Sequence, residues 1–219
     1  MIVFSKYILY FIFYSILGWI MEVILTVVKD KKFVNRGFLL GPVCPIYGWG
    51  VLLIVFLIDS NKSDILAVFL KSIMICSILE YSTSYIMEKL FNARWWDYSN
   101  KKFNINGRIC METMIPFGIL GSIVVLYVHP FLVNTVSKLN NTFLIAFSMV
   151  LLLTYLFDNF ISFNVMSKIK NEIVKYSLDN TEEIKKKVFS FLNNSTYLFK
   201  HIMNAFPKFE IKKKKSGRK

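Results

Sequence analysis

Five long apolar runs, separated by short polar stretches, dominate the chain. They cover about residues 7–28, 38–58, 65–87, 109–128 and 142–163. Each is close to the roughly 20 residues that a helix needs to cross the hydrocarbon core. Backbone groups in lipid must bond within their own segment, and no alternating ten-residue pattern suggests a barrel. We therefore predict an all-α, polytopic membrane helix bundle with about five transmembrane helices.

The composition agrees with a membrane location. Of the 219 residues, 55% are hydrophobic and 16% aromatic, and the mean hydropathy is +0.48. An ordinary soluble domain of this length is less apolar. We expect a transmembrane bundle over residues 1–163, with an interfacial loop over 88–108, and a basic cytoplasmic tail over 164–219.

Lysine and arginine are distributed unevenly between the two sides of this bundle. They concentrate after the first and third apolar runs and in the tail, which holds fourteen basic and five acidic residues. Because basic residues favour the cytoplasmic side, the N-terminus should lie outside and the C-terminus in the cytoplasm. The pattern predicts a multi-pass protein of the cytoplasmic membrane.

The tail should lie against the anionic inner leaflet. Ile184, Val188, Phe191 and Leu198 recur at helical spacing with lysines on the other side, which predicts an amphipathic membrane-surface helix over about 181–205. A helix that packs on a partner subunit is the alternative. Anionic lipid beside the last span is a nearer partner than nucleic acid, which we do not expect to bind.

Three glutamates lie where an ionised side chain is costly. Glu22, Glu80 and Glu112 all fall within roughly 10 Å of the predicted cytoplasmic boundary, at about 1.5 Å per residue. A charge at the bilayer centre costs roughly 2.5–3.5 kcal/mol, so such residues usually face the protein interior and serve a function. Small polar neighbours of Glu22 and Glu80 also suit close helix packing. For Glu88, nearer the boundary, a solvated or structural role fits at least as well.

Arginine is scarce, and three arginines adjoin these glutamates. The chain has 23 lysines but only four arginines, among them Arg36, Arg94 and Arg108. A guanidinium fork suits bidentate binding of carboxylate or phosphate, but structural ion pairs with the glutamates are an equal alternative. We predict a cytoplasmic-side polar pocket for an anionic or amphiphilic ligand, formed by Glu22, Asn35, Arg36, Glu80, Arg94, Asp97, Asn104, Asn106, Arg108 and Glu112.

No cofactor motif is evident. The carboxylates could hold a hard divalent cation through oxygen ligands. The chain has only two histidines, His129 and His201, which gives no support for a histidine zinc site or a Ser-His-Asp triad. The three cysteines show no metal-like spacing and fit small buried apolar residues.

A further group of residues should shape the site rather than bind a ligand. Pro42, Pro45 and Gly48 predict that the second helix is kinked or broken at its cytoplasmic end. Aromatic side chains commonly anchor a protein at the membrane boundary, which is the simple interpretation of Trp95 and Trp96. Trp19 and Tyr98 are likewise expected to have a structural or interfacial role. A re-entrant or interfacial segment over the pocket would also explain the polar residues of this loop, which are Asp97, Asn104, Asn106 and the two arginines.

Several motifs occur in an order that resembles a known bacterial family. They are Gly18-Trp19 with Glu22, the stretch 35–48, Glu80 and Glu88, the run 95–98, and the run 103–108. Together they are similar to the CmpB-like permeases, labelled "putative ABC-transporter type IV", over about residues 15–122. The resemblance implies a bacterial cytoplasmic-membrane protein and transport. Because the chain has no G-x-x-x-x-G-K-[ST] motif, any ATPase would be a separate subunit, and so small a permease could act as a homodimer.

Three functions are consistent with these residues. The first is permease-like transport through the polar pocket. The second is a membrane-embedded enzyme acting on a lipid or phosphorylated amphiphile, with a glutamate as general acid or base and arginines holding the anion. The third is an accessory or assembly protein in which the charges only fix helix register. Whether the chain is an enzyme stays open at this level.

Overall fold

Helices form nearly all of the structure. In the computed structural model, residues 1–58, 64–91, 93–176, 201, 205 and 210–211 are described. The described elements, in chain order, are α1 (Ile2–Asp30), α2 (Pro45–Leu57), α3 (Ile65–Phe91), β1 (Ala93–Arg94), α4 (Met111–Ile123), the π-helix η1 (Val124–Val128), α5 (His129–Ser137), α6 (Asn141–Tyr176) and β2 (Glu210–Ile211). The all-α prediction is confirmed. In the described part of the chain, β-type pairing is limited to the short contact of β1 with β2 and an isolated bridge between Ile105 and Ile109.

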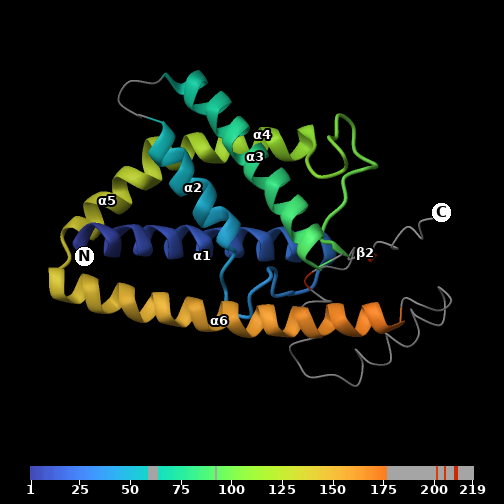
Figure 1. Cartoon of the computed structure of the whole chain (residues 1–219). Coiled ribbons are helices and arrows are strands. Elements are labelled where there is room, and N and C mark those ends of the chain that lie inside the picture. The colour runs from blue at the N-terminus through green and yellow to red at the C-terminus, as the bar shows by residue number, and fades with distance from the viewer. Residues whose placement is uncertain (59–63, 92, 177–200, 202–204, 206–209, 212–219) are drawn as a thin grey trace.

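Four segments are long and apolar enough to cross a membrane. They are Ile2–Asp30, Ile65–Phe91, Met111–Ser137 and Asn141–Lys168, and α2 is a shorter apolar helix. This arrangement confirms the polytopic bundle. Successive segments alternate in direction, so that residues 31–44 and residues 93–110 lie at one end of the bundle, with the end of α6 (Figure 1). We call this the loop end, and these two stretches the first loop and the second loop.

The second helix is shorter than the sequence predicts. It begins at Pro45 rather than near residue 38, and Pro45 occupies the first turn of α2. A proline fits the first turn because it has no N–H to donate, and Pro42 disfavours helix just before it. Just before α2, the amide of Cys44 donates to the carbonyl of Ser15 on α1 at 2.9 Å and not to a carbonyl of its own helix. The predicted break is therefore confirmed, and it leaves about 20 Å of helix at 1.5 Å per residue.

The fourth span is longer than the predicted run 109–128, and a π-helical segment interrupts it. The amide of His129 donates to the carbonyl of Val124, one residue farther back than in an α-helix. Pro130 follows immediately and cannot donate to a carbonyl of the preceding turn. A wider turn relieves the conflict between the proline ring and the preceding carbonyls. The helix therefore continues to Ser137.

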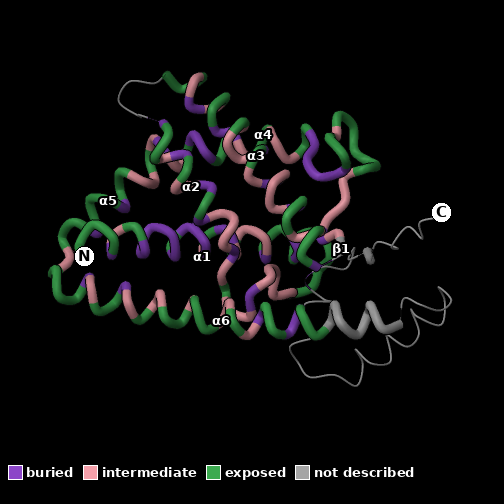
Figure 2. The backbone as a smooth tube through the Cα atoms, viewed as in Figure 1, coloured by how far each residue is buried: buried purple, intermediate pink, exposed green. Residues whose placement is uncertain are grey.

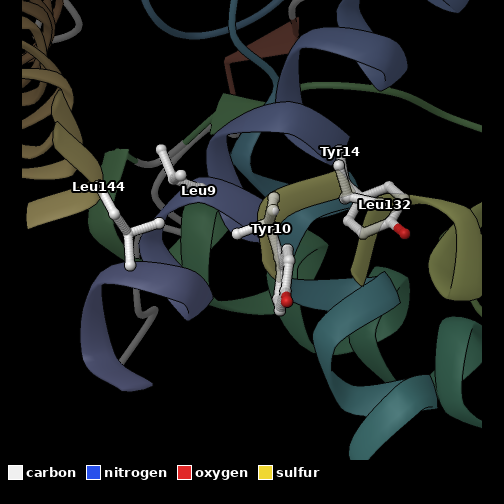
Figure 3. Close-up of a cluster of buried hydrophobic side chains, with 6 residues drawn as sticks. Leu9, Tyr10, Tyr14, Leu132 and Leu144 are labelled. Carbon is white, nitrogen blue, oxygen red and sulfur yellow. The ribbon is translucent and has the colours of Figure 1, made fainter. Parts of the chain in front are cut away.

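Helix α1 lies at the centre of the bundle and packs against α2 and α6, while α3 packs against α4. Buried residues are concentrated along α1, whereas much of α6 is exposed (Figure 2). At the end opposite the loop end, a core cluster joins α1, α5 and α6 (Figure 3). Its buried members are Leu9, Tyr10, Tyr14, Leu132, Val136 and Leu144. Exposed apolar side chains on the spanning helices provide the surface that lipid requires.

The last helix extends beyond its predicted end. The apolar run ends near residue 163, but α6 continues to Tyr176. The predicted surface helix over 181–205 lies outside the described residues, apart from His201 and Ala205.

Small residues bring α1 and α2 into close contact. A Cβ atom added at Gly48 would lie 2.3 Å from Oγ of Ser15 and 2.7 Å from the backbone oxygen of Phe11. A Cβ at Gly18 would lie 2.2 Å from the ring of Tyr47. These glycines therefore set the distance between the two helices, and through it the position of Tyr47 and Glu22.

We expect Gly48→Ala to destabilise the bundle. The added methyl group would separate α1 from α2, and overpacking of this kind typically costs about 1–3 kcal/mol. Thermal unfolding of the detergent-solubilised protein would measure the loss.

Gly50→Ala is the matched control on the same helix. A Cβ there would have its nearest neighbour at 3.5 Å, on Leu79. Because alanine favours helix over glycine by up to about 1 kcal/mol, this variant should be as stable as the wild type or more so. Equal destabilisation by both variants would contradict the assigned role of Gly48.

Candidate functional site

Most of the predicted site residues gather at the loop end. Carboxylates and guanidinium groups from α1, α3 and the two loops form what we call the polar layer. Its members are Glu22, Arg36, Glu80, Glu88, Arg94, Asp97 and Arg108. The layer has three parts with different chemistry, centred on Glu22, on Glu80 and on Glu88.

The first part joins α1, α2 and the first loop. The hydroxyl of Tyr47 donates to Oε1 of Glu22 at 2.5 Å. Nε of Arg36 lies 3.9 Å from the other carboxylate oxygen of Glu22. Nε1 of Trp19 donates to Oδ1 of Asn35 at 2.6 Å, and Nδ2 of Asn35 donates to the carbonyl of Leu40 at 2.8 Å. Asn35 therefore connects α1 to the first loop, and Trp19 anchors that connection.

The first loop is held in place by a carboxylate that the sequence analysis missed. The amides of Leu40 and Gly41 donate to the two oxygens of Asp158 at 3.0 Å and 2.8 Å. The hydroxyl of Ser162 donates to the same carboxylate at 3.1 Å. The break before α2 exposes these amides, and α6 supplies their acceptor. The sequence signal that could have identified Asp158 is an acidic residue within the last apolar run.

Glu80 occupies the second part and is held by hydroxyl groups. It is 7% exposed on α3. The hydroxyl of Tyr98 donates to one oxygen at 3.3 Å, and that of Thr113 donates to the other at 3.4 Å. Thr113 lies in the first turn of α4, where the helix dipole favours a nearby negative charge. Among the described residues, no lysine or arginine forms an ion pair with Glu80.

The third part is an ion-pair network around Glu88. Nη2 of Arg108 lies 2.9 Å from Oε2 of Glu88, and Nε of Arg94 lies 3.5 Å from the same oxygen. Arg108 also donates to the hydroxyl of Ser84 at 3.0 Å and lies 5.4 Å from the ring centre of Tyr85. Glu88 is therefore a member of this layer, mostly buried and paired with two arginines. Its position four residues after Ser84 places both on one face of α3.

The second loop folds through hydrogen bonds from its own polar residues. Nη1 of Arg94 donates to Asp97 at 2.9 Å, and Nη2 of Arg94 donates to the carbonyl of Asn106 at 2.9 Å. Oδ1 of Asn104 accepts from the amide of Gly107 at 3.0 Å. Gly107 has φ +65°, and a Cβ there would lie 2.4 Å from Asp97, so only glycine fits. Asn104 and Asn106 thus shape the loop.

The environment of Asp97 stabilises its charge. Partial burial acts to raise the pKa of Asp97, but hydrogen bonds from the side chain and amide of Ser99 and the charge of Arg94 lower it below the usual value. Asp97 therefore remains a carboxylate at neutral pH and holds Arg94 in place.

Of the two tryptophans of the second loop, Trp95 is buried and Trp96 is half-buried. Trp95 is 3% exposed and packs edge-on against Phe38 and Phe91. Phe163 of α6 completes this aromatic cluster. Nε1 of Trp96 donates to the carbonyl of Arg108 at 3.0 Å. Trp95 therefore fixes the second loop against the bundle, whereas Trp96 forms a hydrogen bond within the loop, and the simple interpretation as boundary anchors included neither contact.

The structure separates Glu112 from the other carboxylates. It lies in the first turn of α4 and forms an exposed ion pair with Lys101 at 2.7 Å. Its place at the start of the helix directs it away from Glu80, whereas Thr113, the next residue, faces Glu80. Within the described part of the chain, no three His, Cys, Asp or Glu side chains converge to hold a metal ion.

Comparison with known proteins identifies a family. A family model described as "Putative ABC-transporter type IV" matches residues 9–163. No curated protein and no solved structure matches the chain. The matched region contains all seven members of the polar layer, together with Tyr47 and Asp158.

We expect Arg108→Lys to destabilise the protein. Lysine keeps the charge but loses the fork that contacts Glu88 and Ser84 together. Removing one partner of a buried ion pair costs about 3–5 kcal/mol, and the lysine variant should lose a large part of that amount. The midpoint of thermal unfolding in detergent would measure it. Lys101→Ala removes the exposed pair with Glu112 and should leave the midpoint almost unchanged, because exposed ion pairs contribute little to stability. Equal losses for the two variants would contradict the structural role of Arg108.

Proposed function

The chain belongs to the family described as putative type IV ABC transporters, and from this premise we propose that it acts as a permease whose ligand binds at Glu80 in the polar layer. The family and the four apolar spanning helices fit a membrane transport protein. The observation that carries the proposed site is the buried carboxylate of Glu80. It has hydroxyl partners but no cation partner among the described residues.

The charge of the polar layer favours a cationic ligand over an anionic one. Four carboxylates (Glu22, Glu80, Glu88 and Asp97) face three guanidinium groups (Arg36, Arg94 and Arg108), so the layer carries one excess negative charge when all four carboxylates are ionised. Each arginine already contacts a carboxylate. An anion would have to displace a carboxylate from an arginine, whereas a cation at Glu80 would give this carboxylate the charged partner that it lacks among the described residues.

This assignment changes the ligand class suggested by the sequence. An anionic or amphiphilic ligand was predicted because three arginines adjoin the glutamates. The ion pairs support the alternative in which Arg94 and Arg108 neutralise Glu88. A cation, or an amphiphile with a cationic headgroup, is therefore the ligand that we propose.

Glu22 and Tyr47 provide a second contact for such a ligand. The pair joins α1 to α2 at the point where Gly18 and Gly48 bring these helices together. Arg36 is 3.9 Å from Glu22, which is long for a charge-assisted hydrogen bond. A cation could replace this weak contact at lower cost than the tight contact of Arg108 with Glu88.

A separate ATPase subunit is the partner that the family suggests. We propose that it binds the second loop, where Phe103 is 79% exposed beside Lys101 and Lys102. The outside N-terminus, the anionic inner leaflet as partner of the tail, and a homodimer stay predictions.

We expect Glu80→Gln to weaken cation binding strongly while keeping the fold. Glutamine retains a hydrogen-bond acceptor for Tyr98 or Thr113, but not the charge. Loss of one partner of a buried charge pair weakens binding by roughly 30-fold or more. The measurement is the shift in melting temperature of the purified protein with K⁺, Mg²⁺, ethanolamine or spermidine at constant ionic strength. At least one cation should stabilise the wild type and not the variant, and the wild type should take up that cation into proteoliposomes.

Glu112→Gln is the control, because it removes an exposed carboxylate outside the polar layer. This variant should bind the cation like the wild type.

Stabilisation by phosphate or octanoate, lost in Arg36→Gln, would reject the cationic ligand in favour of an anionic one. Chemical change of a lipid extract incubated with the purified protein, dependent on Glu80, would instead identify an enzyme. If no cation stabilises the wild type, the proposal is wrong.

A further inference from the structure

The described residues of the C-terminal segment contact both loops of the loop end. His201 and Ala205 lie on the first loop, and β2 pairs with β1 at the start of the second loop. We propose that this segment is an intramolecular strap that ties the two loops together and limits access to the polar layer. By "strap" we mean His201, Ala205 and β2.

His201 holds the carbonyl side of the first loop. It is 6% exposed, and its Nε2 lies 3.0 Å from the carbonyl oxygen of Leu39. The next two amides, of Leu40 and Gly41, donate to Asp158 on α6. The first loop is therefore clamped between α6, which accepts from its amides, and the strap, which contacts its carbonyl.

Ala205 contacts the polar layer directly. Nη1 of Arg36 donates to the carbonyl of Ala205 at 2.5 Å, while Nε of the same guanidinium faces Glu22. Ala205 is fully buried. The strap thus orients the one arginine whose carboxylate contact is long. Any ligand that displaces Arg36 from Glu22 would have to disturb this contact as well.

The second attachment lies at Arg94. In the antiparallel pair, Ala93 is opposite Ile211 and Arg94 is opposite Glu210. Arg94 also belongs to the network around Glu88. Each attachment of the strap therefore adjoins an arginine of the polar layer, one in each loop.

The strap lies outside the region shared with the family. The family model matches residues 9–163, whereas the strap residues are 201, 205 and 210–211. We infer that the strap regulates a site that the family region builds. Its effect on transport rests on the proposed function, but its docking and its effect on access do not.

A disulfide test measures docking in the full-length protein. The Cα atoms of antiparallel partners are about 4.5–5.5 Å apart, within the range that a disulfide spans. In a background with the three native cysteines replaced by alanine, Ala93→Cys with Ile211→Cys should form an intramolecular disulfide in membranes under mild oxidation. Ser137→Cys with Ile211→Cys, which places one thiol at the opposite end of the bundle, should not. Absence of the first disulfide, or disulfides only between two copies, would overturn the docking.

Native Cys44 reports access beneath the first loop. Its side chain is buried, and its thiol donates to the carbonyl of Arg36 at 3.6 Å. Burial raises the pKa of the Cys44 thiol to about 12, so its reaction should depend on opening of the loop. With Cys76 and Cys110 replaced by alanine, His201→Ala should raise the rate of maleimide labelling of Cys44 about 5-fold, the effect of losing one typical hydrogen bond.

His201→Gln, which can still donate to the carbonyl of Leu39, should restore slow labelling. If His201→Ala leaves the rate unchanged although the disulfide forms, the strap docks without limiting access, and that part of the proposal is wrong. Neither result depends on which ligand binds Glu80. Failure of the strap and failure of the proposed function are therefore distinguishable.

Discussion

Polar groups inside a bilayer need partners within the protein, and the architecture of the loop end follows from this constraint. Prolines stop α2 from starting earlier, which leaves the amides of Leu40 and Gly41 without helical acceptors. Asp158 on α6 accepts from both. One carboxylate in the last span thereby connects the break in α2 to a helix more than a hundred residues away in the chain.

The same constraint divides the charged residues into two groups. Glu88 is compensated by two guanidinium groups, with Ser84 and Tyr85 completing the surroundings of Arg108. This arrangement anchors the second loop on α3. Glu80, about two helical turns earlier, has hydroxyl donors and a helix N-terminus but no cation among the described residues. A carboxylate that is fully paired with guanidinium groups, such as Glu88, stabilises one structure. A carboxylate without a cationic partner, such as Glu80, can bind a ligand.

Close packing positions the rest of the layer. Gly18 and Gly48 allow α2 to approach α1 so closely that Tyr47 reaches Glu22. Trp95 fixes the second loop in an aromatic cluster with residues of the first loop, α3 and α6. The proposed strap would add a third connection between the loops. Access to the layer would then depend on contacts outside the family region.

The sequence by itself determined the helical membrane class and the approximate spans, because hydrophobicity acts locally. Proline determined the break before α2. The depth of the charged residues in the membrane determined that Glu22, Arg36, Glu80, Arg94 and Arg108 would lie at one end of the bundle. The sequence could not determine partners, because these depend on helix rotation and on contacts between distant segments. Glu112 was expected in the layer but faces Lys101, whereas the partners of Glu88 and Asp158 could not be read from the local sequence. Only the tertiary structure decided which carboxylates are paired, since a rotation of one residue, about 100° on a helix, separates an outward Glu112 from an inward Thr113.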